Sequence, residues 1–222
     1  MQAIMESFFC IAYLVITSTL GALMIIKAHG NRPRILFSIM TLVLVFGDAF
    51  HLIPRISGLL TDTIVEITDI LGFGTFVPSI TMTVFYVMLY HFWCLRYSKP
   101  VKSGLTITVY ILAICRIALC LFPQNDWLSS DAPLIWGIYR NIPFTLLGAI
   151  IVILFFIEAR KNNDKAFRWA WLAIMLSFLF YLPVVLWSVN IPMIGMLMIP
   201  KTICYVWLVL MGYNDRSSYG KK

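Results

Sequence analysis

Three ionisable side chains, Asp48, His51 and Arg55, lie near the end of an apolar segment, in the string Gly-Asp-Ala-Phe-His-Leu-Ile-Pro-Arg. Their spacing of i, i+3 and i+7 places all three on one face of a helix. A carboxylate one turn from an imidazole can act as a general acid and base or as a proton relay. Asp48 and His51 are therefore the candidate catalytic residues, and a passive hydrogen bond between them is the alternative.

The composition predicts a protein that is embedded in a membrane. The chain has 222 residues, of which 61% are hydrophobic and 12% are charged, whereas soluble domains have about 45–50% apolar and 25% charged residues. The apolar excess runs along the whole sequence. We therefore expect an all-α, polytopic membrane protein in which residues 1–222 form a single domain.

Seven segments are long and apolar enough to span a bilayer, which takes roughly 20 residues. Between the sixth and seventh segments a tight turn is expected at residues 188–190, and a re-entrant sixth segment is the alternative. The predicted spans are residues 5–26, 35–54, 75–95, 104–122, 133–157, 169–188 and 190–212.

Basic residues predict the direction of these spans. Three of the loops and the C-terminal tail that fall on one side of a seven-span arrangement carry most of the Lys and Arg. The positive-inside rule then places the N-terminus outside and the C-terminus inside, and the net charge of +7 needs no nucleic acid to explain it. The basic residues of these three loops and the tail are Lys27, Arg32, Arg34, Arg96, Lys99, Lys102, Arg160, Lys161, Lys165, Arg168, Arg216, Lys221 and Lys222.

Three further cations lie inside the predicted spans. At about 1.5 Å per residue, Arg116 and Arg140 lie on the order of 10 Å below the outer boundary, at the depth of Asp48, and Lys201 lies near the midplane. Pairing with Asp48 is the simplest solution for Arg116. One carboxylate cannot neutralise two arginines and a lysine, so the sequence predicts either a neutral Lys201 or an anionic ligand. Arg55 is shallower and is expected to reach the outer interface.

The predicted ligand site combines these charges with polar side chains at similar depths. Its members are Asp48, His51, Arg116, Arg140, Asn141, Lys201, Tyr181 and Trp187.

No metal or cofactor is expected. The three histidines lie at different depths, and the five cysteines show no metal-like spacing. P-loop, dinucleotide-binding, HExxH and nucleophile-elbow motifs are absent from the sequence. Residues 63–66, Thr-Ile-Val-Glu, match a capping box and predict a short helix on the outer surface.

Two resemblances add expectations about architecture. Seven spans with the N-terminus outside resemble the opsins and small seven-helix transporters, and Lys201-Thr202 is similar to the retinal-bearing lysine of opsins. Span 3 has no carboxylate counter-ion, however, so retinal is not expected. The string at residues 47–55 resembles multi-pass proteins of Gram-positive bacteria, which implies the plasma (inner) membrane and implies no activity.

The sequence leaves three functions open. The leading hypothesis is a protein with an outward-facing, positively charged cavity that binds or transports a small anionic or amphiphilic molecule. The second is an intramembrane lipid-modifying enzyme in which Asp48 and His51 act as acid and base. The third is a structural or receptor-like protein with a static ion-pair network. The only other partners expected are membrane lipids, and oligomeric state is not predicted.

Overall fold

The computed structural model describes residues 2–61, 68–101, 103–129, 132–188 and 191–215. Within these ranges the chain is helical, and seven of its helices are long and apolar enough to cross a membrane. These helices are α1 (Gln2–Ile26), α2 (Arg32–Thr61), α3 (Thr68–Arg96), α4 (Ser103–Leu121), α5 (Leu134–Lys161), α6 (Ala170–Trp187) and α7 (Met198–Asn214). The all-α, multi-pass architecture is therefore confirmed.

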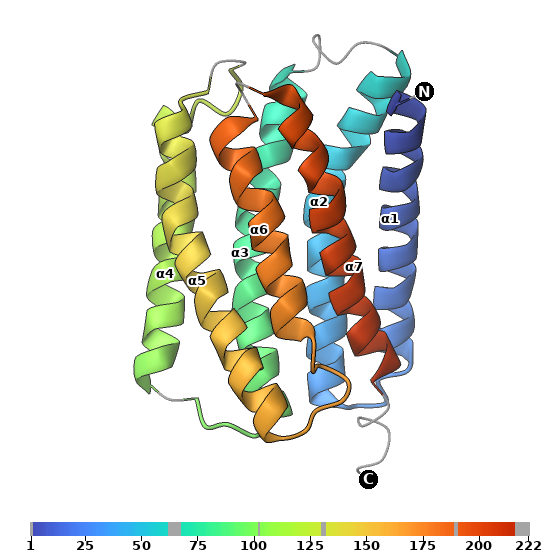
Figure 1. Ribbon diagram of the computed structural model, residues 1–222, viewed down its shortest axis with the longest axis vertical. Helices are drawn as coiled ribbons and strands as arrows, with labels where there is room; N and C mark the ends of the chain where they lie inside the picture. The colour runs from blue at the N-terminus through green and yellow to red at the C-terminus, as the bar shows by residue number, and fades with distance from the viewer. Residues whose placement is uncertain (1, 62–67, 102, 130–131, 189–190, 216–222) are drawn as a thin grey trace.

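The helices run alternately up and down, and they pack as a closed bundle (Figure 1). Each helix contacts the next one along the chain, α7 also contacts α1, and α3 reaches α5. The side chains at the centre of the bundle are mainly aromatic, with Phe85, Tyr86 and Tyr90 of α3 almost fully buried. Close helix packing places Gly47 directly against Thr81, where a larger side chain would clash.

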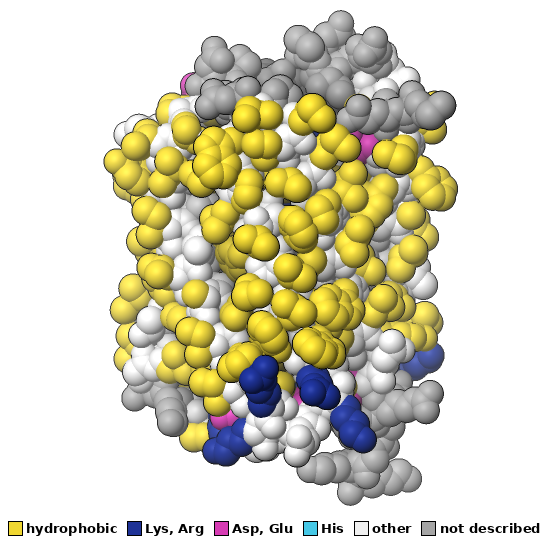
Figure 2. Space-filling view, viewed as in Figure 1, with side chains coloured by type: hydrophobic (Ala, Val, Ile, Leu, Met, Phe, Trp, Pro, Cys, Tyr) yellow, Lys and Arg dark blue, Asp and Glu magenta, His cyan; other side chains and the backbone are white. Residues whose placement is uncertain are grey.

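The surface of the bundle has the polarity expected beside lipid. Figure 2 shows hydrophobic side chains over most of one face, with Lys and Arg gathered toward one end. Phe8, Ile26 and Ile114 are each at least 65% exposed, a distribution that would be unfavourable in water. The connections after α1, α3 and α5 and the end of α7 lie together at the end with the lysines and arginines (Figure 1), which we call the basic end.

Helix α2 continues beyond its predicted end at Pro54. Proline has no N–H to donate to the carbonyl of Phe50, yet the helix extends to Thr61. Gly74 of α3 packs close to that carbonyl, because a Cβ atom on Gly74 would lie 2.6 Å from the Phe50 oxygen. The last part of α2 leans toward the start of α1 in Figure 1, so the proline bends α2 without ending it.

Helix α7 begins later than predicted. Residues Pro192–Leu197 form a 3-10 helix, and α7 proper starts at Met198. Pro200 therefore lies in the first turn, where proline is tolerated because the first N–H groups of a helix have no partner within it. Lys201 lies in the same turn of α7, inside the apolar segment Met193–Asn214 that is long enough to cross a membrane, and its midplane position stays a prediction.

Two predictions concern residues outside the described ranges. The capping box at residues 63–66 falls there, as do residues 189–190 of the predicted turn. The other predicted span boundaries agree with the observed helices to within about four residues, and α3 begins seven residues early, inside the predicted outer loop.

Candidate functional site

Asp48 receives a hydrogen bond from a residue that the sequence analysis did not single out. The Tyr13 hydroxyl of α1 donates to Asp48 Oδ2 at 2.6 Å, and Tyr13 is buried. Tyr13 lies eight residues into the first predicted span, or roughly 12 Å deep. The depth argument that grouped Asp48 with the cations would therefore have found Tyr13 if it had been applied to span 1.

Asp48 and Arg55, which were predicted to share one helix face with His51, contact different residues of α1. Arg55 Nε lies 2.5 Å from Glu6 Oε1 at the start of α1, so Arg55 is ion-paired as well as half-exposed. Asp48 receives a hydrogen bond from Tyr13, and the acid–base pair of Asp48 with His51 stays a prediction.

Lys201 lies among aromatic rings near the start of α7. Its Nζ is 4.9 Å from the centre of the Tyr181 ring and 5.8 Å from that of Tyr205, an arrangement in which the rings stabilise the cation. Electrostatic interactions link Lys201 to Asp48 and to Arg116. Lys201 therefore interacts with both the Asp48 carboxylate and the Arg116 guanidinium.

Arg116 of α4 is almost fully buried, with 2% of its surface exposed. Its guanidinium carbon lies 3.4 Å from the centre of the Phe144 ring of α5. Nε and Nη1 have no hydrogen-bond partner among the described residues. In the same part of the chain no carboxylate lies within 4.0 Å of Arg116, so the predicted pair with Asp48 is wrong.

Arg140 of α5 is held by neutral groups. Its Nη1 donates to Asn125 Oδ1 at 2.8 Å, and the guanidinium carbon lies 4.2 Å from the centre of the Trp127 ring. Asn125 is buried, and its amide donates to the carbonyls of Leu119 and Phe122. The connection between α4 and α5 thus positions Arg140 without neutralising it. The role of Asn125 could not be predicted from the sequence, because a residue in a loop follows no helical periodicity that would show which side chains it faces.

Asn141 and Tyr181 are brought together, whereas Trp187 is not. The Tyr181 hydroxyl donates to Asn141 Oδ1 at 2.8 Å, and Asn141 Nδ2 donates to the Gly137 carbonyl at 2.8 Å. Trp187 is the last residue of α6 and is 49% exposed. It is absent from the contacts that the described residues make around Lys201 and Arg116.

We call Arg116, Arg140 and Lys201 the cation cluster. Electrostatic interactions connect Asp48 to Lys201, Lys201 to Arg116, and Arg116 to Arg140. Four helices supply these four side chains, and their shared depth in a bilayer stays a prediction. Asp48 is the one carboxylate in this group, against three cations, when every side chain carries its usual charge.

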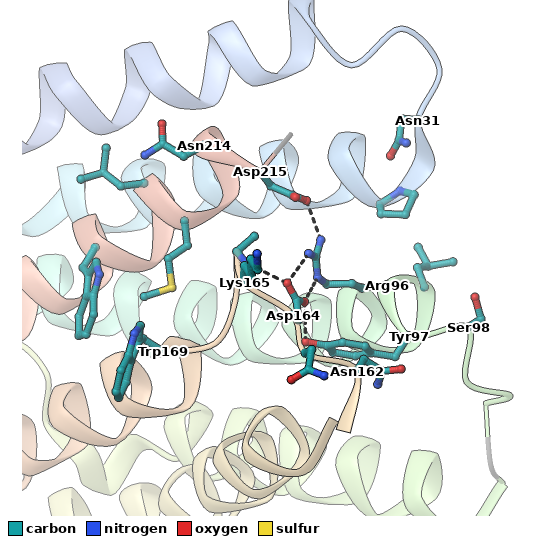
Figure 3. Close-up of a pocket in the computed structure, with 17 residues that line it drawn as sticks. Asn31, Arg96, Tyr97, Ser98, Asn162, Asp164, Lys165, Trp169, Asn214 and Asp215 are labelled. Carbon is teal, nitrogen blue, oxygen red and sulfur yellow. Dashed lines mark hydrogen bonds and ion pairs between the residues drawn. The ribbon is translucent and has the colours of Figure 1, made fainter. Parts of the chain in front are cut away.

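One cavity lies elsewhere, at the basic end. It has a volume of about 1180 Å³, and its walls come from the start of α2, the end of α3, the α5–α6 connection and the end of α7 (Figure 3). A second cavity of about 370 Å³ lies between α4 and α5 and is lined by Leu112, Cys115, Leu119, Tyr139, Ile142, Pro143 and Leu146. An outward-facing cavity at the cation cluster remains a prediction.

Arg96 organises the wall of the basic-end cavity. Its Nε and Nη2 contact the Asp164 carboxylate at 2.5 and 2.8 Å, and its Nη1 contacts Asp215 Oδ2 at 2.6 Å. The Tyr97 hydroxyl donates to Asp164 Oδ2 at 2.9 Å, and Figure 3 shows Arg96 between the two aspartates. Because these residues come from the ends of α3 and α7 and from the α5–α6 connection, the network ties three parts of the bundle together.

The same network determines the titration of Asp164. Burial alone would raise the pKa of this carboxyl, but hydrogen bonds and charge from Arg96 outweigh burial and hold the pKa below its usual range. The Phe167 N–H and the Tyr97 hydroxyl act in the same direction. The aspartate is therefore a strong ion-pair partner at neutral pH.

The structure offers no metal centre in the part of the chain that it describes, since no three His, Cys, Asp or Glu side chains there lie close enough to share an ion. The chain matches no protein-family model, and no curated protein or solved structure shows significant similarity to it. What the fold defines is the class: seven apolar helices compatible with an integral, multi-pass membrane protein.

Replacing Tyr13 with phenylalanine should destabilise the protein, because Asp48 then loses a hydrogen bond deep in the bundle. Hydrogen bonds to charged groups contribute roughly 1.5–3 kcal/mol, and unfolding in detergent should show a loss of that size. The control is Tyr139→Phe at a side chain that is 46% exposed, where a change within about 0.5 kcal/mol is expected. Equal stability of Tyr13→Phe and wild type would contradict the assigned hydrogen bond.

Acid should weaken the network around Asp164. A carboxyl whose pKa is lower in the folded state stabilises the fold above its unfolded pKa of roughly 4 and loses that contribution as the pH falls through the folded value. The melting temperature, followed from pH 7 to pH 3, should fall more steeply in wild type than in Asp164→Asn. Asp126→Asn, at an exposed side chain, should follow wild type, and parallel profiles for wild type and Asp164→Asn would refute the assignment.

Proposed function

We propose that the protein binds a small anionic or amphiphilic molecule within the membrane, with Arg116, Arg140 and Lys201 supplying the charge that holds it. Asp48 and Tyr13 would orient Lys201 and the ligand. A protein with seven membrane-spanning helices would use such a site to bind the molecule or to transport it across the membrane.

The buried guanidinium of Arg116 carries this proposal. A charged side chain in a low-dielectric interior is costly unless a counter-charge and hydrogen bonds compensate for it. Phe144 offers only its ring, and two of the guanidinium nitrogens lack hydrogen-bond partners among the residues described. An anion could accept both of these hydrogen bonds and supply the missing negative charge.

The environment of Arg140 supports the same conclusion. Its partners, Asn125 and Trp127, are neutral, and each leaves the positive charge of the arginine in place. The arginines at the other positions differ. Arg55 is paired with Glu6, and Arg96 is paired with two aspartates. Arg116 and Arg140 therefore differ from Arg55 and Arg96 in having no carboxylate partner among the described residues.

We further propose that the N-terminus faces outward and that the protein resides in the plasma membrane. The gathering of lysines and arginines at the basic end, where α7 ends, supports this orientation (Figure 1 and Figure 2). In this orientation the cation cluster lies in the outer half of the bilayer.

A static, structural role is the second candidate, and the ion pairs at the helix ends favour it. Arg96 connects the end of α3 to residues beyond α5 and α7, and Lys99 Nζ lies 2.8 Å from Glu158 Oε1. In that interpretation the cation–ring contact of Arg116 with Phe144 is packing only. The two candidates differ in whether an anion binds at the cluster.

The test uses dodecyl phosphate as the probe, with the full-length protein in phosphatidylcholine nanodiscs. Binding measured by calorimetry should weaken at least tenfold in Arg116→Gln and in Arg140→Gln, because each substitution removes charge-assisted hydrogen bonds of roughly 1.5–3 kcal/mol. Arg168→Gln, at an exposed arginine of the basic end, is the matched control and should bind like wild type.

Binding that is unchanged in both cluster variants would overturn the proposal. No binding in wild type, combined with a large loss of thermal stability in Arg116→Gln, would support the structural role in its place.

A further inference from the structure

Arg116 and Arg140 lie one helical turn apart along the interface between α4 and α5. Arg116 contacts Phe144 of α5, which comes four residues after Arg140. Arg140 donates to Asn125, and the Asn125 amide donates to the carbonyl of Cys120, four residues after Arg116, at 3.4 Å. The two arginines therefore belong to successive turns of the same interface, and they interact electrostatically.

Tyr181 of α6 connects this interface with Lys201 of α7. The centre of the Tyr181 ring lies 4.9 Å from Lys201 Nζ and 6.1 Å from the centre of the Phe144 ring, over which Arg116 lies. Lys201 and Arg116 also interact electrostatically. A ligand group bound to Arg116 would therefore experience the charges of Arg140 and Lys201 as well.

The charges of the cation cluster do not balance. Arg116, Arg140 and Lys201 carry three positive charges, and Asp48, which interacts with Lys201, carries one negative charge. The other described contacts of the three cations, which are Asn125 and aromatic rings, are neutral. The described side chains therefore leave an excess of two positive charges, and an uncompensated charge is costly in an interior of low dielectric.

The hydrogen-bond donors of the cluster suit an oxyanion with several acceptor oxygens. Arg116 is 2% exposed, and its Nε and Nη1 have no partner among the described residues. The ammonium group of Lys201 adds N–H donors of its own. A carboxylate offers two oxygens to such donors, whereas the phosphate of a monoester offers three terminal oxygens and roughly 1.5–2 negative charges at neutral pH.

We propose that the cation cluster binds a phosphate monoester and discriminates against groups with a single negative charge. This inference rests on the proposed function and specifies the class of its ligand. A doubly charged phosphate balances the two excess positive charges, whereas a carboxylate, a sulfate or a phosphodiester leaves one of them unbalanced. Because charges interact more strongly in a protein interior than in water, this difference of one charge dominates the selectivity.

Two ligands that differ by one charge test the proposal. Dodecyl phosphate and dodecyl methyl phosphate share the same alkyl chain, but at about pH 8 only the monoester is doubly charged, since its second ionisation has a pKa near 6. Calorimetry with the full-length protein in nanodiscs should show that the monoester binds at least tenfold more tightly than the diester. Ethyl phosphate distinguishes the source of the group: tight binding of ethyl phosphate supports a water-soluble ester, and binding of dodecyl phosphate alone supports an amphiphile.

A charge variant gives a second measurement. Lys201→Met removes one of the two excess charges and should reduce the preference for the monoester to less than about threefold. Lys165→Met, at an exposed lysine of the basic end, is the matched control and should keep the wild-type preference. If Lys201→Met does not fold, the comparison of the two ligands in the unmutated protein decides the question.

The outcomes separate this inference from the proposed function. Equal binding of the two dodecyl ligands that still depends on Arg116 would overturn the preference for a doubly charged group and leave the anion site standing. Dodecyl phosphate binding that is unchanged in Arg116→Gln, or absent in wild type, would overturn both.

Discussion

The arrangement of the bundle depends on a guanidinium buried without a carboxylate. Arg116 is 2% exposed and lies over Phe144, and its charge must be tolerated in an interior from which water is excluded. The surrounding side chains reflect this constraint. Tyr86, Tyr181 and Tyr205 supply rings and hydroxyls around the cluster. The hydroxyls of Tyr86 and Tyr205 are hydrogen-bonded to each other, and the Tyr181 hydroxyl donates to Asn141. Aromatic rings stabilise cations without adding a negative charge, so they lower the cost of the buried charge and leave room for an anion.

Near the ends of the helices, two arginines are instead paired with carboxylates. Arg96 is shared by Asp164 and Asp215, and Arg55 is paired with Glu6. The Arg55 pair depends on the bend at Pro54, which brings the last part of α2 toward α1 (Figure 1). These contacts fix the two ends of the bundle, and the region between them contains the cation cluster. A stable frame around an uncompensated charge is the arrangement that a binding site needs, because the frame holds the donors in place before the ligand arrives.

Position along a helix can be predicted from the sequence, whereas rotation about the helix axis cannot. Because helical rise is constant, counting residues predicts a shared depth for Asp48, Arg116 and Arg140. The count for Lys201 is changed by residues 192–197, which form a 3-10 helix that delays the start of α7. The partners were missed for a different reason: which face of α1 meets α2 decides that Tyr13 binds Asp48, and the neighbouring faces of α4 and α5 decide that Arg116 meets Phe144. Asn125, in the loop after α4, follows no periodic pattern at all. The cavity between α4 and α5 likewise depends on how the two helices pack, and no sequence motif predicts it.

Native mass spectrometry of the protein extracted from its own membrane shows whether an anion accompanies Arg116. We expect one anionic amphiphile per chain to be retained in wild type and in the Arg168→Gln control, and to be lost in Arg116→Gln. A wild-type chain that carries no such molecule, together with an Arg116→Met variant at least as stable as wild type, would show that the buried charge binds no ligand and is not needed for the fold.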